Sequence, residues 1–304
     1  MMRGKRYNER PARAARRRKG DRDRASGHPR REKIYIYGKH ALAEALLNAP
    51  HVVRKVFLSD EVDDPELRAL LRKSAVPVEA VRSRDAGRMV GEDTAHQGVI
   101  ATVDPGALVR DFREFAAGFE KRPPDARTLL VLLDELTDPH NVGAIIRSAA
   151  AFGATGVLMP VHNQAPVTGA VVKASAGMVF RVPLVAIGNV NQAVDRLKKD
   201  FGFRTYGLVM DGAQVLAEEK FDAPALVIVG NEGTGIREHT LARCDVGLRI
   251  PMEPRCESLN ASVSAAVVLY QWSAVHGIGA PDADSVPADA GTDARGVAGA
   301  DART

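Results

Sequence analysis

The sequence lacks any apolar stretch long enough to cross a membrane. Its longest apolar runs, at residues 128–133 and 225–230, have the length of a strand, whereas a membrane helix needs about 20 such residues. The positively charged N-terminus is followed by no apolar stretch before Ile34, so the central region of a secretory signal is also missing. We therefore expect a cytoplasmic protein without a membrane partner.

Cysteine is equally scarce, which limits the possible disulfides and metal sites. The chain has two cysteines, Cys244 and Cys256, and neither lies in a CxxC pair or near histidines at a zinc-binding spacing. This spacing excludes a disulfide framework and argues against a zinc site. We expect two reduced structural thiols and no bound metal.

The net charge of +4 is unevenly distributed along the chain. Residues 1–32 hold thirteen Lys or Arg against four Asp or Glu, whereas residues 280–304 hold two Arg against five Asp. Such segments cannot bury enough apolar surface to order themselves, so we expect disordered tails over 1–32 and 278–304. The basic tail can neutralise the phosphates of a nucleic acid, or it can simply aid solubility.

The remaining chain is long enough for two folded domains, and its 45% apolar and 26% charged residues are typical of a globular protein. Short apolar strands alternate with helical patterns over 33–103, which predicts a small α/β domain. Residues 104–127 are interpreted as a linker. Over 128–277 the alternation restarts with longer elements and no internal repeat, which predicts a mostly parallel sheet with helices on both faces.

Ligands bind at the carboxyl ends of the strands in such sheets, so we expect a site in the loops that follow strands. The first of these loops runs from Asp134 to Gly143 and leads into a helix. Asn141 can cap that helix, Gly143 lets another backbone or a ligand come close, and Arg147 lies one turn later on the same face. A simple cap and a surface cation remain the alternative interpretation of Asn141 and Arg147.

The second loop follows the predicted strand 225–230 and has three glycines in six residues, from Gly230 through Gly233 to Gly235. Backbone amides there can face a ligand, although a tight turn would need the same glycines. The loop matches neither the phosphate-binding pattern that ends in Gly-Lys-Ser/Thr nor the dinucleotide pattern. This mismatch argues against a kinase or a dehydrogenase.

The third loop runs from Ile250 past Met252 into the last predicted helix. Ser258 and Asn260 are good capping residues, and the free amides of a first helical turn can hold polar atoms of a ligand. Capping alone would explain both residues. It would not explain why three loops rich in Gly, Asn or Ser follow three strands of one sheet.

Together, the three loops resemble the signature motifs of the SpoU family of RNA ribose 2′-O-methyltransferases, TrmH-like members of the knotted SPOUT superfamily. The resemblance spans residues 128–276. It rests on three stretches in the family's order: Asp138-Pro139-His140-Asn141-Val142-Gly143-Ala144-Ile145-Ile146-Arg147-Ser148-Ala149, then Val229-Gly230-Asn231-Glu232-Gly233 with Gly235-Ile236, then Ile250-Pro251-Met252 with Ser258-Leu259-Asn260-Ala261-Ser262-Val263. The third motif departs from the family's pattern at Pro254, where a glycine is usual.

The front domain resembles the RNA substrate-binding domain attached to some family members, a fold similar to ribosomal proteins that bind kinked RNA. The similar stretches begin at Tyr37-Gly38-Lys39-His40-Ala41 and end at Gln97-Gly98-Val99-Ile100-Ala101. This resemblance implies an rRNA partner, with a guanosine of 23S rRNA favoured over tRNA.

The resemblance also implies a deep trefoil knot that forms the pocket for S-adenosyl-L-methionine, and it implies a homodimer. The residues of this sequence that match the family's cofactor-binding positions are Gly230, Gly233, Ile250, Met252 and Leu259. Those that match its catalytic positions are Asn141, Arg147, Glu232, Ser258 and Asn260.

In the family, the residue that matches Arg147 is assigned the removal of the proton from the ribose hydroxyl. A charged guanidinium has no free acceptor and a pKa above about 12. Either its surroundings lower that pKa strongly, or Arg147 is a cation that holds a developing alkoxide or a phosphate while another group takes the proton.

Two other functions are compatible with the sequence. One is the same chemistry on tRNA or at another rRNA position. The other is a non-catalytic RNA-binding protein in which the tail and the front domain do the binding.

Overall fold

The structure is a computed structural model that describes residues 33–91, 94–211, 214–256 and 258–278. Apart from Ile278, the two segments expected to be disordered tails, 1–32 and 278–304, lie outside the described residues. Among the described residues, no helix is both long and apolar enough to cross a membrane. The same part of the chain holds no cluster of three or more His, Cys, Asp or Glu side chains suited to a metal ion.

The front of the chain folds around a four-stranded sheet in the order β1-β4-β2-β3. The central strand β4 runs antiparallel to both of its neighbours, and β3 runs parallel to β2. All four strands were expected from the sequence. The elements of this part are β1 (Ile34–Tyr37), α1 (Lys39–Asn48), β2 (Val53–Leu58), α2 (Pro65–Ser74), β3 (Val78–Ala80), α3 (Ser83–Val90) and β4 (Val99–Val103). Of these, α3 was not expected, although its apolar residues Ala86, Met89 and Val90 recur at helical spacing.

The second part is built on an eight-stranded sheet in which every neighbouring pair is parallel. This arrangement confirms the predicted α/β class with a mostly parallel sheet. In spatial order the strands are β10 (Gln214–Val215), β12 (Val246–Arg249), β9 (Arg204–Leu208), β11 (Ala225–Gly230), β6 (Leu129–Asp134), β7 (Gly156–Pro160), β8 (Leu184–Ile187) and β5 (Val109–Asp111).

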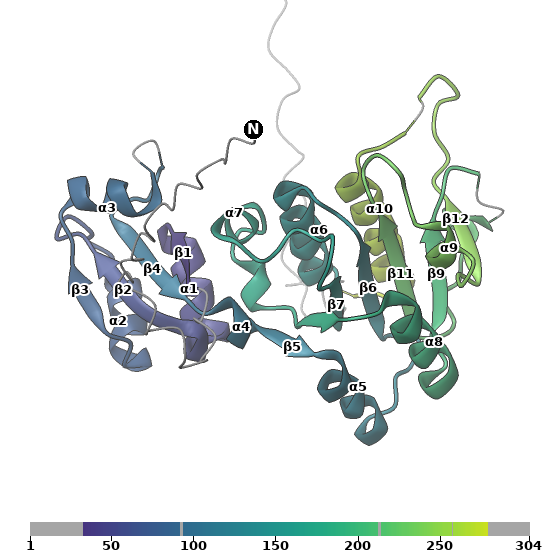
Figure 1. The fold of residues 1–304 in the computed structure, drawn as a ribbon, viewed down its shortest axis with the longest axis horizontal. Helices are drawn as coiled ribbons and strands as arrows, with labels where there is room; N and C mark the ends of the chain where they lie inside the picture. The colour runs from purple at the N-terminus through teal and green to yellow at the C-terminus, as the bar shows by residue number, and fades with distance from the viewer. Residues whose placement is uncertain (1–32, 92–93, 212–213, 257, 279–304) are drawn as a thin grey trace, which may run out of the picture. The chain divides into compact units, whose positions relative to one another are not determined.

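Helices cover both faces of this sheet (Figure 1). Successive residues of a strand point to opposite faces, so Leu129 and Val131 of β6 join one apolar cluster, whereas Leu130 and Leu132 join the other. The first cluster includes residues of α6 and α10, and the second includes residues of α8 and Phe119 of α5. The helices are α4 (Pro105–Leu108), α5 (Phe112–Lys121), α6 (Pro139–Ala151), α7 (Gly169–Ala174), α8 (Val190–Phe201), α9 (Glu238–Leu241) and α10 (Ala261–Val275).

The segment 104–127 differs from the linker expected there. Its residues 109–111 form β5, which pairs in parallel with β8 and becomes the edge strand of the large sheet. The following helix α5 is capped by Asp111 and packs Phe115 and Phe119 against the second apolar cluster. The apolar residues of α5 thus belong to the core of the second part.

The start of α6 also differs from expectation. Asn141 does not cap this helix, because Asp138 accepts the hydrogen bond from the His140 amide and Pro139 occupies the first turn. Proline suits that position because its missing N–H would have no partner there anyway. Asn141 therefore lies inside the helix and is 7% exposed.

The two cysteines are free but have unlike surroundings. Burial raises the pKa of the Cys244 thiol to about 12, which keeps it protonated and unreactive. Cys256 is exposed. The expectation of a structural thiol therefore fits the surroundings of Cys244, whereas Cys256 contributes nothing to the core.

Gly143 marks the closest approach of two helices, α6 and α7. A Cβ added there would lie 2.5 Å from the Cβ of Ala174, 2.8 Å from the carbonyl oxygen of Val171 and 3.0 Å from the amide of Ser175. Glycine is therefore needed at this position because the backbone of α7 lies where a side chain would be.

We predict that Gly143→Ala lowers the free energy of unfolding by about 1–3 kcal/mol, because the backbone atoms of α7 cannot move aside cheaply. The matched control is Gly118→Ala on α5, where an added Cβ meets no atom within 4 Å. Alanine is the better helix former, so the control should gain about 0.5–1 kcal/mol. Urea unfolding followed by circular dichroism measures both. Equal effects of the two substitutions would contradict this account.

Candidate functional site

The loops singled out in the sequence follow strands that lie close together at the carboxyl edge of the large sheet. β6 and β11 are direct neighbours, with Asp134 opposite Gly230 in the register. β12 lies two strands further on, next to β9. Because parallel strands end at the same edge, the first and second loops leave the sheet side by side. The third loop leaves the same edge at the end of β12, on the other side of β9.

A cavity of about 310 Å³ opens at this edge, beside the ends of β9, β11 and β12 and the start of α10. Its volume lies within the usual range for small-molecule sites. Its wall combines backbone at strand ends with apolar side chains, of which Met210 and Leu259 are 49% and 39% exposed. The lining residues are Leu208, Val209, Met210, Val229, Gly230, Asn231, Glu232, Gly233, Gly235, Leu248, Ile250, Met252, Ser258, Leu259, Ala261 and Ser264.

The cavity brings together seven of the ten residues proposed from the sequence. They are Gly230, Glu232, Gly233, Ile250, Met252, Ser258 and Leu259. The other three, Asn141, Arg147 and Asn260, do not line it. Asn260 instead caps α10, because its side chain accepts hydrogen bonds from the amide and the hydroxyl of Ser262 at 2.9 and 2.7 Å.

Asn141 reaches the cavity wall through one hydrogen bond. Its Nδ2 donates to Oε1 of Glu232 at 2.9 Å and so joins α6 to the second loop across 91 residues of sequence. Glu232 is exposed at the wall, whereas Asn141 is buried. This bond is the direct link between the first and second motifs.

Arg147 is exposed although it follows Gly143 by one helical turn. Gly143 is buried against α7, whereas Arg147 one turn later is exposed to solvent. Within the described part of the chain, the Arg147 guanidinium has no hydrogen bond or ion pair to another side chain. All its donors are therefore free for an external acceptor.

The third loop contains a reverse turn at the position where it departs from the family's pattern. The amide of Cys256 donates to the carbonyl oxygen of Glu253 at 2.8 Å, which makes Pro254 the second residue of a four-residue turn. Proline is favoured there because its fixed φ suits the turn. The loop therefore accommodates Pro254 while Ile250, Met252, Ser258 and Leu259 still line the cavity.

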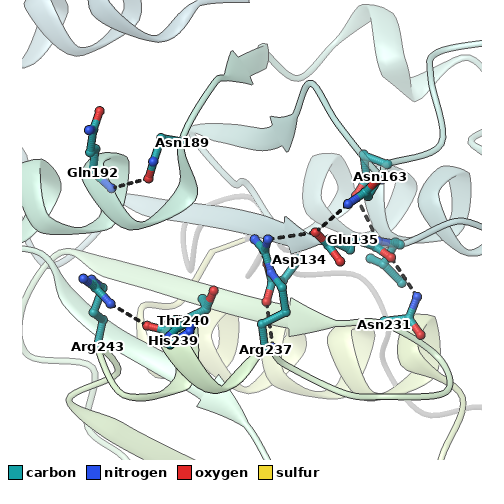
Figure 2. A network of polar contacts seen from close by, with 12 residues as sticks. Asp134, Glu135, Asn163, Asn189, Gln192, Asn231, Arg237, His239, Thr240 and Arg243 are labelled. Atoms are coloured by element: carbon teal, nitrogen blue, oxygen red, sulfur yellow. Dashed lines mark hydrogen bonds and ion pairs between the residues drawn. The ribbon is translucent and has the colours of Figure 1, made fainter.

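Sequence reasoning missed a polar network that surrounds the first two loops (Figure 2). Asp134 is fully buried and binds Arg237, which also pairs with Glu135. Burial lowers the pKa of Arg237, but its hydrogen bond and charge contacts with Asp134 and Glu135 outweigh this effect and raise the pKa above its ordinary value. One feature of the sequence could have revealed this network. Two adjacent acidic residues, Asp134 and Glu135, lie at a strand end, where they need a cation nearby.

Comparison with known proteins identifies two family matches. Residues 128–270 match the SpoU rRNA Methylase family, and residues 35–108 match the RNA 2′-O ribose methyltransferase substrate-binding family. The first match covers the large sheet except β5, and the second covers the small sheet from Tyr35 and ends just before β5.

Individual relatives agree with these matches. The chain is 34% identical over 240 residues to the 23S rRNA (guanosine-2′-O-)-methyltransferase RlmB of Pseudomonas putida, covering 78% of this chain and 94% of that one. It is 31% identical over 241 residues to a Staphylococcus saprophyticus protein named as a putative TrmH family tRNA/rRNA methyltransferase, covering 79% and 95%.

A solved structure has the same fold. The SpoU methyltransferase AviRb of Streptomyces viridochromogenes, in complex with the cofactor AdoMet, superposes with a TM-score of 0.67 at 25% identity, covering 80% of this chain and 90% of that one. With both domains matched and a curated relative aligned over most of its length, this chain belongs to the SpoU family of RNA methyltransferases.

Proposed function

We propose that this protein transfers a methyl group from S-adenosyl-L-methionine to the 2′-hydroxyl of a ribose in RNA, with a guanosine of 23S rRNA as the substrate. The observation that carries the proposal is the cavity at the sheet edge, whose wall is joined to the first motif by the Asn141–Glu232 hydrogen bond. The RlmB relatives support the rRNA guanosine.

The residues at the cavity fit the proposed cofactor. An adenine ring needs apolar flanks, and the exposed side chains of Leu259 and Met210 offer them. Backbone groups at Gly230, Gly233 and Ile250 can satisfy its polar atoms, and Met252 adds further apolar surface. When bound, S-adenosyl-L-methionine supplies an activated methyl group on a positively charged sulfur.

The remaining proposed residues hold and orient the RNA. The Arg147 side chain is exposed, and its guanidinium has no hydrogen bond or ion pair to another side chain among the described residues. Such a group suits a cation that binds a phosphate or a developing alkoxide. We therefore prefer this cationic role over proton abstraction. Asn141 keeps Glu232 in place at the cavity wall, and Ser258 provides a hydroxyl on the opposite loop. Asn260 acts indirectly, by fixing the start of α10.

The family also implies a knot and a dimer. We propose that the segment from Ile250 into α10 passes through the chain as a trefoil knot. The membership of the chain in the SpoU family supports this topology. Both RNA substrates considered are cytoplasmic molecules, so the proposed location is the cytoplasm.

The proposed dimer contact is the outer face of α10. Val263, Val267 and Tyr270 share this face at helical spacing and are 47%, 36% and 60% exposed. Together with Ala144 and Ser148 of α6 they line an open groove without a charged side chain. A second copy of the same face would cover these apolar groups.

The substrate is tested by mapping 2′-O-methyl groups in total RNA from cells with and without the gene. We expect one guanosine of 23S rRNA to lose its methyl group and to regain it when the purified protein and S-adenosyl-L-methionine are added. Loss of a methyl group from tRNA instead would assign the alternative substrate. Failure of the protein to bind S-adenosyl-L-methionine in calorimetry would favour a non-catalytic RNA-binding protein.

Replacing Arg147 should separate chemistry from cofactor binding. We expect Arg147→Ala to lower the methylation rate at least about 100-fold, because the cation proposed to hold the developing alkoxide or a phosphate is lost. The dissociation constant for S-adenosyl-L-methionine should change less than about twofold. The matched control is Arg113→Ala, another exposed helical arginine, which should retain full activity. A full methylation rate in Arg147→Ala would refute the assigned role.

The dimer is tested by placing a charge on the outer face of α10. We expect Val267→Asp to convert the dimer to a monomer in sedimentation velocity, because the carboxylate would be buried without a partner. Leu47→Asp on α1, where the leucine is 59% exposed, is the control and should leave the mass unchanged. A dimer that persists in Val267→Asp would place the contact elsewhere.

A further inference from the structure

Arg237 lies just after the second loop and uses four donors to bind the end of β6. Its backbone amide donates to Oδ2 of Asp134 at 3.0 Å, and its Nε and Nη2 donate to Oδ1 of the same residue at 2.9 and 2.6 Å. Its Nη1 donates to Oε1 of Glu135 at 2.7 Å. One side chain therefore fixes two consecutive carboxylates of the first loop (Figure 2).

Glu135 needs this support because its backbone is strained. Its φ is +63°, a left-handed conformation that residues other than glycine rarely adopt. Besides Arg237, Asn163 donates to the Glu135 carboxylate at 3.1 Å, and Asn231 donates to the Glu135 carbonyl oxygen at 2.8 Å. Contacts from three residues in two loops, one after β7 and one after β11, thus hold the first turn after β6 in place.

The second loop is closed on itself and attached to the sheet at both ends. Asn231 and Gly235 exchange backbone hydrogen bonds at 3.0 and 2.9 Å, and the Gly233 amide donates to Oδ1 of Asn231 at 2.9 Å. A side chain on Gly230 would overlap the backbone of Gly235 and Ile236. The loop is therefore a compact unit. Besides the Asn141–Glu232 bond, two attachments join it to the turn directly after β6, namely the Asn231–Glu135 bond and the Arg237 contacts.

Glu232 lies between these two attachments. It lines the cavity together with Gly230, Gly233 and Gly235, and it accepts the hydrogen bond from Asn141. Any rotation of the loop about its Asn231 end would move the Glu232 carboxylate relative to Asn141 and change the shape of the cavity wall. The second attachment, made by Arg237, prevents that rotation.

We propose that Arg237 is a positioning residue for methyl transfer. It locks the second loop to the end of β6, so that the cavity wall and the Asn141–Glu232 contact are in place before ligands bind. Arg237 does not line the cavity, so it acts through the loop rather than by touching a ligand. This role rests on the proposed function of the site.

Lysine is the informative replacement. It keeps a positive charge near the buried carboxylate of Asp134, so the substitution does not leave that charge uncompensated. A lysine ammonium is a point charge, however, and cannot form the planar fork that spans Asp134 and Glu135 together. Arg237→Lys therefore removes the geometry of the contact while preserving its charge.

The matched control is Arg243→Lys. Arg243 follows the same loop and pairs with Asp195 at 3.3 Å, and its Nη1 donates to the carbonyl oxygen of His239 at 2.7 Å. The side-chain exposures of Arg243 and Arg237 are similar, at 34% and 41%. None of its side-chain contacts reaches the first or second loop.

The experiment compares both variants with the wild-type protein in three measurements. Calorimetry gives the dissociation constant for S-adenosyl-L-methionine, methylation of 23S rRNA gives kcat and KM, and hydrogen exchange gives the protection of the amides over 233–236. We expect Arg237→Lys to weaken cofactor binding at least about tenfold, to lower kcat, and to speed loop exchange at least about tenfold. Arg243→Lys should stay within about twofold in all three.

A double-variant cycle tests whether Arg237 acts through Glu232. If it does, the losses in kcat caused by Arg237→Lys and Asn141→Ala should be less than additive, because both disturb the same contact. Additive losses, or a lower melting temperature with unchanged affinity and unchanged loop exchange, would overturn the proposal and leave Arg237 a stabilising residue only. Failure of the wild-type protein itself to bind the cofactor would instead refute the proposed function.

Discussion

The in-register parallel pairing of β6 with β11 is the constraint on which the site depends. It sets Asp134 opposite Gly230 and makes the first and second loops leave the sheet side by side. A fully buried carboxylate at that edge requires a cation and donors, because an unpaired buried charge is strongly destabilising. Arg237 meets this need and in doing so ties the end of the second loop to the end of β6.

The start of α6 supplies the other half of the arrangement. Because Asp138 and Pro139 begin the helix, Asn141 lies inside its first turn, and its side-chain amide donates to Glu232. Gly143 lets α7 pack directly against the next turn. The helix therefore contacts the second loop through Asn141 and α7 through Gly143. Such contacts suit a site whose polar groups must be oriented before ligands bind.

The site therefore combines a preformed half and an open half. The cavity wall is fixed by backbone pairing and by the network around Glu135, and Glu232 accepts a hydrogen bond from Asn141. Arg147, in contrast, lies in solvent without a described partner. This division suits a small cofactor that enters a shaped pocket and a large RNA that supplies the remaining contacts from outside.

The sequence by itself determined the class of the fold, most of the strands and the three loops, because apolar period and glycine spacing are local properties of the chain. It favoured Asn141 as the cap of α6, whereas Asp138 is the cap in the structure, since both residue types suit that position. It also placed 109–111 in a linker, because a strand of three residues is defined by its pairing with β8 rather than by a pattern of its own. The tertiary structure alone brought Arg237 to Asp134 across 103 residues and Asn141 to Glu232 across 91, because such contacts depend on the order of strands in the sheet.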